Sequence, residues 1–330
     1  MEKCKYEYKM NKAVLFLIFN RLDTAQKSFE QIRIAKPPRF YLASDGARPE
    51  KEGEKKIVEL VRKWVLDNID WDCEVKTLFR DENLGCGEAI SSAISWFFEH
   101  EADGIIIEDD IVVSQSFFRY CEELLEKYKN DNRIMMVTGC CYLKNGYKLD
   151  GQSYFFYDGG IYGWATWRRA WKLYDKKMTL WENENAREIF KNFRGEDYFN
   201  RNFLDYDATY RGKIDTWDYQ WVFTRAMNNG LTCTPCTNLS TNIGFGHPKA
   251  THTISFEETI PLGELEFPLV EPKYIAFEKR YGELCQPREE ASVSVKPNRR
   301  LRDFFFHKER ENKNRIITIL NTFKIKYSKS

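Results

Sequence analysis

The chain has 330 residues, of which 42% are hydrophobic and 15% aromatic, enough for one or two domains with a large buried core. Its 51 Lys and Arg residues nearly balance its 50 Asp and Glu residues. The resulting formal charge of +1 gives no reason to expect a nucleic-acid partner. No stretch approaches the roughly 20 apolar residues of a membrane-spanning helix, and the opening MEKCKYEYKMNK lacks the apolar part of a secretory signal. Nine scattered cysteines fit reduced thiols, so we expect a cytoplasmic globular protein.

Predicted strands and helices alternate through the first part of the chain. Apolar runs predict strands at residues 13–19, 39–44, 73–79 and 104–107. Helical spacing follows at residues 24–34, 58–69, 88–100 and 114–128, with Thr24 and Ser114 as expected N-caps. This alternation predicts an α/β fold with a mostly parallel sheet covered by helices on both faces.

Polar residues and glycines gather where these predicted strands end. Arg21, Asp45 and Gly85 each follow a strand, and the three acids at residues 108–110 follow the fourth. Because ligands of open parallel sheets bind at the carboxyl ends of the strands, we expect a binding site there.

The three consecutive acids in GIIIEDDIVV lie between two apolar runs. They could simply begin a loop and cap the next helix, but IVV separates them from the cap at Ser114. Clustered carboxylates at a strand end suit a hard cation such as Mn²⁺ or Mg²⁺. A cation there usually bridges phosphoryl oxygens, so a diphosphate ester is the expected ligand.

A dinucleotide-binding motif is the first alternative, because Gly85 and Gly87 form a GxG and Glu108 follows at a suitable distance. The third small position of that motif is not glycine, and the polar residues RDEN separate the strand from Gly85. The context therefore disfavours dinucleotide binding.

Several motifs in order resemble one family. They are Asp45 in SDG, the turn NLGCGEA, IIIEDD followed by SFF, then YDGGIYGWATW, TWDYQW, and IGFG followed by THT. Over about residues 12–252 the chain resembles the GT-A nucleotide-sugar glycosyltransferases, most closely the N-acetylglucosaminyltransferase I type. The resemblance implies a Rossmann-like GT-A catalytic domain at residues 1–255, with a nucleotide-sugar half at about 1–115 and an acceptor half at about 116–255.

The resemblance also implies roles for the donor site. Asp110 would bind the metal directly, and Glu108 and Asp109 would contact the donor sugar and ribose. Asp45 would accept a hydrogen bond from the uracil imide, and Arg21 would lie near the base or the diphosphate. The alternatives are a simple turn for Asp45 and a solvated charge at a helix entry for Arg21.

Other implied contacts lie further along the chain. Within YDGGIYGWATW, Asp158, Gly160 and Trp164 would contact the acceptor or the sugar, and His252 would be a ligand of the metal or the diphosphate. Residues 164, 167 and 171 are tryptophans spaced as on one helical face, which is more typical of a core. A histidine in a loop is, by itself, more often only a surface residue.

The acceptor hydroxyl needs a base. A carboxylate opposite the leaving group can deprotonate that hydroxyl during a single in-line displacement, which inverts the anomeric carbon. Asp218 in TWDYQW is the candidate, and Asp215 is its rival. The family has two adjacent acids in this segment, whereas this chain has Asp218 and Tyr219.

Residues 256–330 are predicted to be a helical, basic C-terminal extension. From residue 296 to the end, 11 basic residues face three acids. Such a segment would either lie on an anionic membrane surface or pack on the catalytic domain.

Together these features predict a metal-dependent, inverting glycosyltransferase of polysaccharide biosynthesis, peripheral at the cytoplasmic membrane face. Its donor would be a UDP-sugar, with N-acetylglucosamine the first guess, and its acceptor a glycan or a lipid-linked saccharide. The alternatives are a sugar nucleotidyltransferase and a non-catalytic, calcium-dependent carbohydrate-binding module.

Overall fold

The computed structural model describes residues 8–248 and 260–285, and three strands between residues 306 and 328. They belong to two compact units, Met1–Cys285 and Gln286–Ser330. The first unit extends beyond residue 255, where we expected the catalytic domain to end, because residues 260–285 return to it. Tyr281 is fully buried, and an isolated β-bridge joins Phe156 to Phe277.

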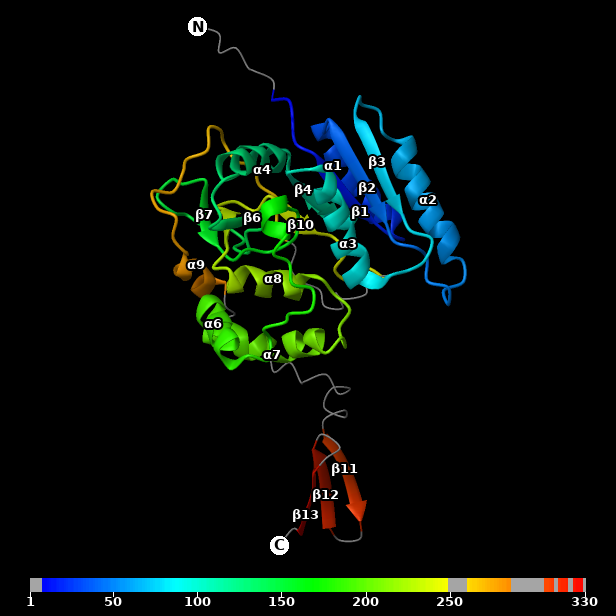
Figure 1. Ribbon diagram of the computed structural model, residues 1–330, viewed down its shortest axis with the longest axis vertical. Helices are drawn as coiled ribbons and strands as arrows, with labels where there is room; N and C mark the ends of the chain where they lie inside the picture. Colours follow the sequence, from blue (N-terminus) through cyan, green and yellow to red (C-terminus); the bar gives the residue numbers. More distant parts are fainter. Residues whose placement is uncertain (1–7, 249–259, 286–305, 312–313, 320–322, 329–330) are drawn as a thin grey trace. The chain divides into compact units, whose positions relative to one another are not determined.

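An eight-stranded sheet forms the centre of the first unit, in the order β3-β2-β1-β4-β8-β6-β9-β7 (Figure 1). Its strands are β1 (Val14–Ile18), β2 (Arg39–Ser44), β3 (Glu74–Phe79), β4 (Asp103–Glu108), β6 (Ile134–Thr138), β7 (Tyr154–Tyr157), β8 (Trp164–Trp167) and β9 (Leu231–Pro235). Strands β3, β2, β1 and β4 run parallel, as do β6 and β9, whereas β8 and β7 are antiparallel to their neighbours. The predicted mostly parallel α/β sheet is confirmed.

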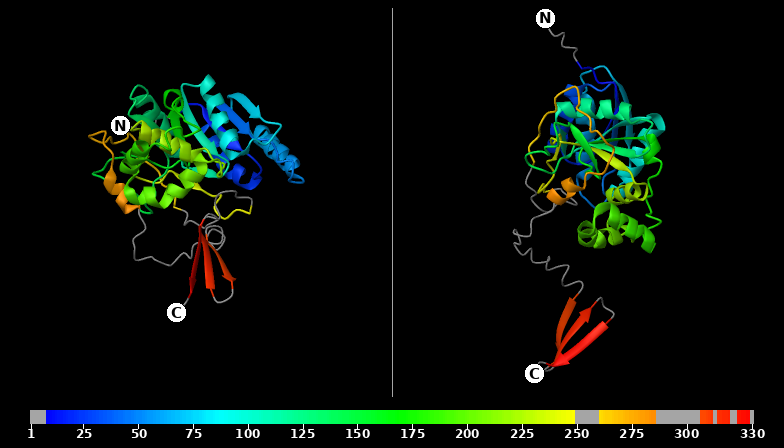
Figure 2. Two further views of the ribbon diagram at one scale, coloured as in Figure 1. Left: turned by 60° about the horizontal axis from the view of Figure 1, so that its bottom comes forward. Right: turned by 90° about the vertical axis from the view of Figure 1, so that its left-hand side faces the viewer.

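Helices cover both faces of this sheet. The described helices of the first unit are α1 (Leu22–Ala35), α2 (Glu54–Asp67), α3 (Gly85–His100), α4 (Gln115–Lys127), α5 (Arg168–Trp171), α6 (Glu184–Arg194), α7 (Glu196–Tyr210), α8 (Asp218–Met227) and α9 (Lys279–Leu284). Helices α6 and α7 pack against α8. Alternate side chains of a strand point to opposite faces, so Phe16 packs with α1, α2 and α4, while Leu15 packs with α3, α5 and α8. The helical layers can be followed in Figure 2. Burial on both sides explains why β1 is apolar throughout.

The starts of two helices differ in how well the sequence predicts them. Helix α1 begins after Arg21 rather than at Thr24, whose hydroxyl instead donates to the Arg21 carbonyl. Ser114 does precede α4, as expected, but its side chain makes no capping hydrogen bond. The Glu264 carboxylate accepts from the first two amides of α4 at 3.2 and 2.8 Å, so residues 260–285 supply the cap.

The tryptophans do not lie on one helix. Trp164 and Trp167 belong to β8, and Trp171 to α5. The predicted helix was wrong because β8 lies between β4 and β6 with both faces covered, so every residue of WATW is buried and no period-two alternation marks the strand. The expected core position is confirmed, because all three tryptophans are buried. Trp164 is fully buried and stacks on Trp217 with a centroid separation of 5.5 Å.

The second unit is a three-stranded antiparallel sheet, not the predicted helix. Its strands are β11 (Phe306–Glu311), β12 (Asn314–Ile319) and β13 (Phe323–Ser328), in sequence order. The correction has a simple physical reason, because FKIKYS alternates apolar and polar residues with the period of a strand. Within the part of the chain that the structure describes, no helix is long and apolar enough to cross a membrane.

Candidate active site

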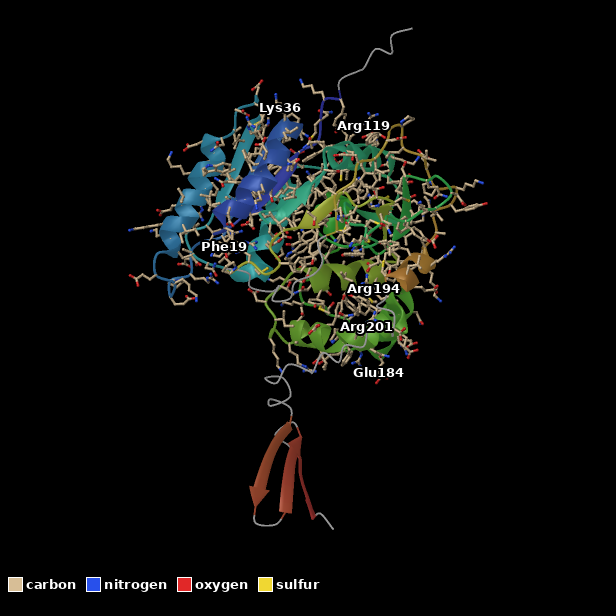
Figure 3. All side chains as sticks on the ribbon, turned by 180° about the vertical axis from the view of Figure 1, so that it is seen from behind. Phe19, Lys36, Arg119, Glu184, Arg194 and Arg201 are labelled. Atoms are coloured by element: carbon tan, nitrogen blue, oxygen red, sulfur yellow. The ribbon has the colours of Figure 1, made fainter. Side chains whose placement is uncertain are left out.

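The order of strands creates a switch point between β1 and β4. From β1 the chain continues to β2 and β3 on one side, and then returns to place β4 on the other side of β1. Ligands of open α/β sheets bind in the crevice at such a point, outside the carboxyl ends of the strands. Figure 3 labels Phe19 at this end of β1, and Lys36 at the far end of α1. Arg21 and the three acids flank this switch point.

Arg21 bridges two of the three acids. One guanidinium nitrogen lies 2.5 Å from Asp109 Oδ1 and the other 2.9 Å from Asp110 Oδ2. The Phe19 amide donates to Asp109 Oδ2 at 3.1 Å, and the Ser28 hydroxyl donates to the Asp109 carbonyl. Asp109 is therefore fixed by β1 and α1 together, while Asp110 is held on one side by Arg21.

The acidic cluster is short of positive charge. Burial, reinforced by the neighbouring carboxylates of Asp110 and Asp109, raises the pKa of Glu108 to about 8. Burial also raises the pKa of Asp109, to about 6, although Arg21 opposes it. Burial would lower the pKa of Arg21, but the two aspartates hold it above its ordinary value. Within residues 8–248 and 260–285, no hydrogen bond or ion pair engages the Glu108 carboxylate, so Arg21 balances the charge of this cluster only in part.

A second, two-stranded sheet brings a distant segment to the acids. Strand β5 (Ile111–Val113) pairs antiparallel with β10 (Ser240–Asn242), and the Ile243 amide donates to the Asp110 carbonyl at 2.8 Å. A Cβ at Gly244 would clash with the Asp110 carboxylate and approach Arg21, so glycine allows this close approach of backbone. His252, the proposed ligand of the metal or the diphosphate, lies outside the described residues.

These residues open onto a cavity of about 480 Å³. That volume is within the range of small-ligand sites, about 300–1,000 Å³. Six acids and three arginines line the cavity: Asp45, Glu108, Asp109, Asp110, Asp215, Asp218, Arg21, Arg48 and Arg80. The donor-half predictions and the candidate base thus share one cavity, although they come from segments over 100 residues apart in sequence.

Asp218 and its rival Asp215 have different environments. Asp218 is the first residue of α8, and one of its oxygens accepts from the Thr216 hydroxyl and from the Tyr219 amide. Asp215 instead accepts from the Cys86 and Gly87 amides at 2.8 and 3.0 Å, which caps the amino end of α3. Both Asp215 oxygens are engaged, whereas no hydrogen bond among the described residues uses the second oxygen of Asp218.

Asp45 lines the cavity but already accepts several hydrogen bonds. Its donors are the Gly46 amide at 2.9 Å, the Leu84 amide at 3.0 Å and the Asn83 side chain at 2.9 Å. Burial raises the pKa of Asp45. The carboxylate ties the end of β2 to the turn before α3, which leaves little acceptor capacity for a nucleobase.

The residues predicted to contact the acceptor lie outside the cavity lining. Asp158, Gly160 and Trp164 do not line the cavity, whereas Ile161 and Tyr162 from the same segment do. Asp158 is fully buried and forms ion pairs with Arg225, at 2.9 Å, and with Arg194, which Figure 3 labels at the end of α6. Gly160 is buried too, and its carbonyl accepts from the Thr138 hydroxyl.

Comparison with known proteins yields fold-level similarity alone. No protein-family model and no curated protein matches the chain. Among solved structures it is similar to a Pyrobaculum calidifontis mannosyltransferase in complex with GDP-Man and Mn²⁺, with 13% identity, a TM-score of 0.33, and coverage of 50% of this chain and 46% of that one. It is also similar to S. aureus TarS, with 9% identity, a TM-score of 0.38 and coverage of 69% and 58%. For an inositol-1-phosphate CTP transferase from T. maritima the identity is 10%, the TM-score 0.36 and the coverage 70% and 86%.

The likeness to these structures is one of fold. All three TM-scores lie below 0.5, and the chain spans about half the length of the mannosyltransferase. By their printed names one of these proteins is a mannosyltransferase carrying GDP-Man and another is a CTP transferase, but the similarities carry no argument for a shared activity. They do not support the narrower likeness to the N-acetylglucosaminyltransferase I type.

Sequence reasoning missed several residues of the site. Asn83 and Gly244 were not singled out, and Asp215 was considered as a base rather than as a helix cap. A glycine-rich helix start without its own Ser, Thr, Asp or Asn cap at Leu84 was a signal that the cap comes from elsewhere. Nothing local in the sequence indicates that Asp215 is the residue that supplies it.

Proposed function

We propose that the chain is a metal-dependent, inverting glycosyltransferase that takes its sugar from a UDP-sugar, with UDP-N-acetylglucosamine the first donor to test. One observation carries the proposal. A single cavity at the switch point of the sheet joins Arg21 and the acids of the donor half to Asp218 of the other half. A group-transfer enzyme needs this combination of a charged donor site and a base from the acceptor side.

The residues fit a divalent cation by their chemistry. Hard cations prefer oxygen ligands, and the cavity offers the carboxylates of Glu108 and Asp110 with their charge incompletely balanced. Among the described residues no three His, Cys, Asp or Glu side chains already converge as a metal centre. Asp110 would hold Mn²⁺ or Mg²⁺, and His252, outside the described residues, is proposed as a second ligand of the metal or the diphosphate. The bound cation would neutralise charge on the departing diphosphate.

The protein's own groups would bind and orient the donor. Arg21 lies at the amino end of α1, where a guanidinium and the positive end of the helix both favour an anion such as a diphosphate. Glu108 and Asp109 are proposed to contact the donor sugar and ribose. Asp45 is proposed to accept from the uracil imide with the acceptor capacity that the Gly46, Leu84 and Asn83 donors leave.

Asp218 is proposed to deprotonate the acceptor hydroxyl. Its carboxylate borders the cavity and keeps one oxygen unengaged among the described residues, whereas both oxygens of Asp215 are used by α3. A single displacement with one base inverts the anomeric carbon. A retaining product would contradict this assignment.

Two other functions fit less well. A sugar nucleotidyltransferase would be expected to have a glycine-rich nucleotide loop after the first strand, but three residues, 19 to 21, separate β1 from α1. A calcium-dependent carbohydrate-binding module catalyses no reaction, so it would not require a base such as Asp218 beside the acids. It would also bind sugar without any dependence on nucleotide.

The proposed acceptor is a glycan or a lipid-linked saccharide. The basic residues from 296 onward motivate a peripheral position on an anionic membrane, because each such charge near the surface is attracted by about 1 kcal/mol. Acceptors fixed to that membrane would then be concentrated near the enzyme.

The test is UDP release from a panel of UDP-sugars with and without Mn²⁺. We expect metal-dependent release from one donor, and a loss of about 10²-fold or more for Asp110→Asn. Asp218→Asn should bind the donor normally but lose transfer to a glycan acceptor by about 10²–10⁴-fold. Folding of each variant is checked by circular dichroism.

The control is Asp67→Asn on the exposed side of α2, which should behave as wild type. If no donor releases UDP and Ca²⁺ alone stabilises the protein, the carbohydrate-binding module becomes the better description. Incorporation of a nucleoside monophosphate into a sugar phosphate would point to the nucleotidyltransferase.

A further inference from the structure

Arg21 is placed where a cation would bind. Its two terminal nitrogens contact Asp109 and Asp110 separately, so one planar guanidinium spans both carboxylates. The side chain is 17% exposed and lines the cavity, so it borders the space a donor would fill. The two aspartates differ in their other partners. The Asp109 carboxylate also accepts from the Phe19 amide, whereas among the described residues the ion-pair partner of the Asp110 carboxylate is Arg21.

Two consequences of this geometry follow from charge alone. A divalent cation approaching Asp110 competes with a full positive charge 2.9 Å from its carboxylate. A diphosphate entering the same cavity offers Arg21 another anion, and arginine binds phosphate with the same two-pronged geometry that it uses for carboxylate. Loss of the Arg21 contact would thus leave the Asp110 carboxylate available to a cation. A diphosphate in the cavity would offer the Arg21 guanidinium another anion to bind.

We propose that Arg21 is a charge gate that holds the metal site closed until a nucleoside diphosphate draws it away from Asp110. This inference rests on the proposed function and adds its regulation. The metal and the nucleotide would bind cooperatively because each removes an obstacle to the other. Free metal at cellular levels would not occupy the acids without a donor.

The Gly244 segment restricts how Arg21 can move. The Ile243 amide holds this segment to the Asp110 carbonyl, and a Cβ added at Gly244 would lie 2.9 Å from a terminal nitrogen of Arg21. The guanidinium is thus bounded by backbone on this side and by the cavity on another. The proposed displacement of Arg21 is therefore toward the cavity that it lines, where a diphosphate would bind.

The experiment measures Mn²⁺ binding directly, by the electron paramagnetic resonance signal of free Mn²⁺, in the presence and absence of UDP. In the wild type we expect UDP to tighten Mn²⁺ binding by a factor typical of coupled sites, about 5–150. In Arg21→Gln, Mn²⁺ without UDP should bind more tightly than in the wild type, and the effect of UDP should shrink. Arg33→Gln removes an arginine from the exposed side of the same helix and should match the wild type.

A second variant protects the test against misfolding. Arg21→Lys keeps a positive charge but places it at one point, so it cannot span both carboxylates and should give intermediate Mn²⁺ binding. The proposal is overturned if both Arg21 variants bind Mn²⁺ without UDP no more tightly than Arg33→Gln does. Failure of UDP to bind any of the proteins would instead contradict the proposed function, while the arm without UDP still tests the competition between Arg21 and Mn²⁺.

Discussion

Asp215 and Asp218 lie three residues apart, but their carboxylates have different environments. Asp215 lies against the amino end of α3, where it accepts from two backbone amides more than 120 residues away in sequence. Asp218 begins α8 and borders the cavity. Because Asp215 fastens the segment before α8 to the start of α3, we propose that it is a positioning residue for Asp218.

The substitution Asp215→Asn should lower stability by about 1 kcal/mol, within the range of about 0.5–2 for the loss of a cap. The two oxygens of Asp215 serve different amides, so an asparagine leaves one amide facing an NH₂ group. Urea unfolding measures the change. Asp218→Asn should leave the unfolding midpoint nearly unaltered, since it keeps the oxygen that accepts from the Tyr219 amide.

The variants Asp215→Asn and Asp218→Asn also distinguish a structural role of these acids from a catalytic one. Asp215→Asn should reduce transfer in part, through the position of Asp218, and retain the wild-type pH profile of the rate. If Asp215→Asn abolished transfer without loss of stability, Asp215 would be the base and the assignment of Asp218 would be wrong.

The connection between β2 and α2 depends on one carboxylate at the start of the helix. Glu54 accepts from the Asn20 side chain at 2.8 Å, from the Arg48 amide at 2.8 Å and from the Arg48 guanidinium. Burial would raise the pKa of Glu54, but these donors lower it below its ordinary value of 4.5. The ion pair also keeps Arg48 at the edge of the cavity.

This lowered pKa makes a prediction about pH. A carboxylate that is more acidic in the folded state stabilises the fold above its unfolded pKa of about 4.5, and this contribution is lost as pH falls through the folded pKa. Glu54→Gln should therefore be less stable than the wild type at pH 7, and the difference should vanish in acid below the folded pKa. Chemical unfolding at a series of pH values measures it, with Glu30→Gln, at an exposed pair on α1, as the control. A difference that stayed constant with pH would show that packing, not charge, is lost.

The elements that the sequence predicted well are those whose pattern is local. Strands β1, β2, β3 and β4 and their helices follow from apolar runs and helical spacing, and the residues at the strand ends meet because parallel strands share an edge. The failures depend on distant neighbours. The pattern of WATW predicts part of a helix because the flanking strands β4 and β6 are distant in sequence, and no local pattern shows that Asp158 pairs with Arg194 and Arg225. The caps from Asp215 and Glu264 have no local signal at all.

Residues 260–285 complete the first unit, although they follow the last strand of its sheets. Glu264 caps α4, the Ser153 amide donates to the Val270 carbonyl, and Tyr281 is buried with Tyr147 and Phe155 around it. A catalytic domain that ended at residue 255 would leave the start of α4 uncapped and an apolar cluster open to water.

Two shortened chains test this division together with the proposed role of the tail. A chain of residues 1–285 should unfold cooperatively at the wild-type midpoint, whereas a chain of residues 1–255 should lose several kcal/mol, from about 1 for the Glu264 cap and about 2 for burial of Tyr281.

The full chain should sediment with anionic phospholipid vesicles at low salt, and residues 1–285 should not, because the 11 basic residues after position 295 are gone. Equal binding by the two chains would remove the membrane role of the tail. Equal stability of residues 1–255 and 1–285 would instead show that the first unit closes without the returning segment.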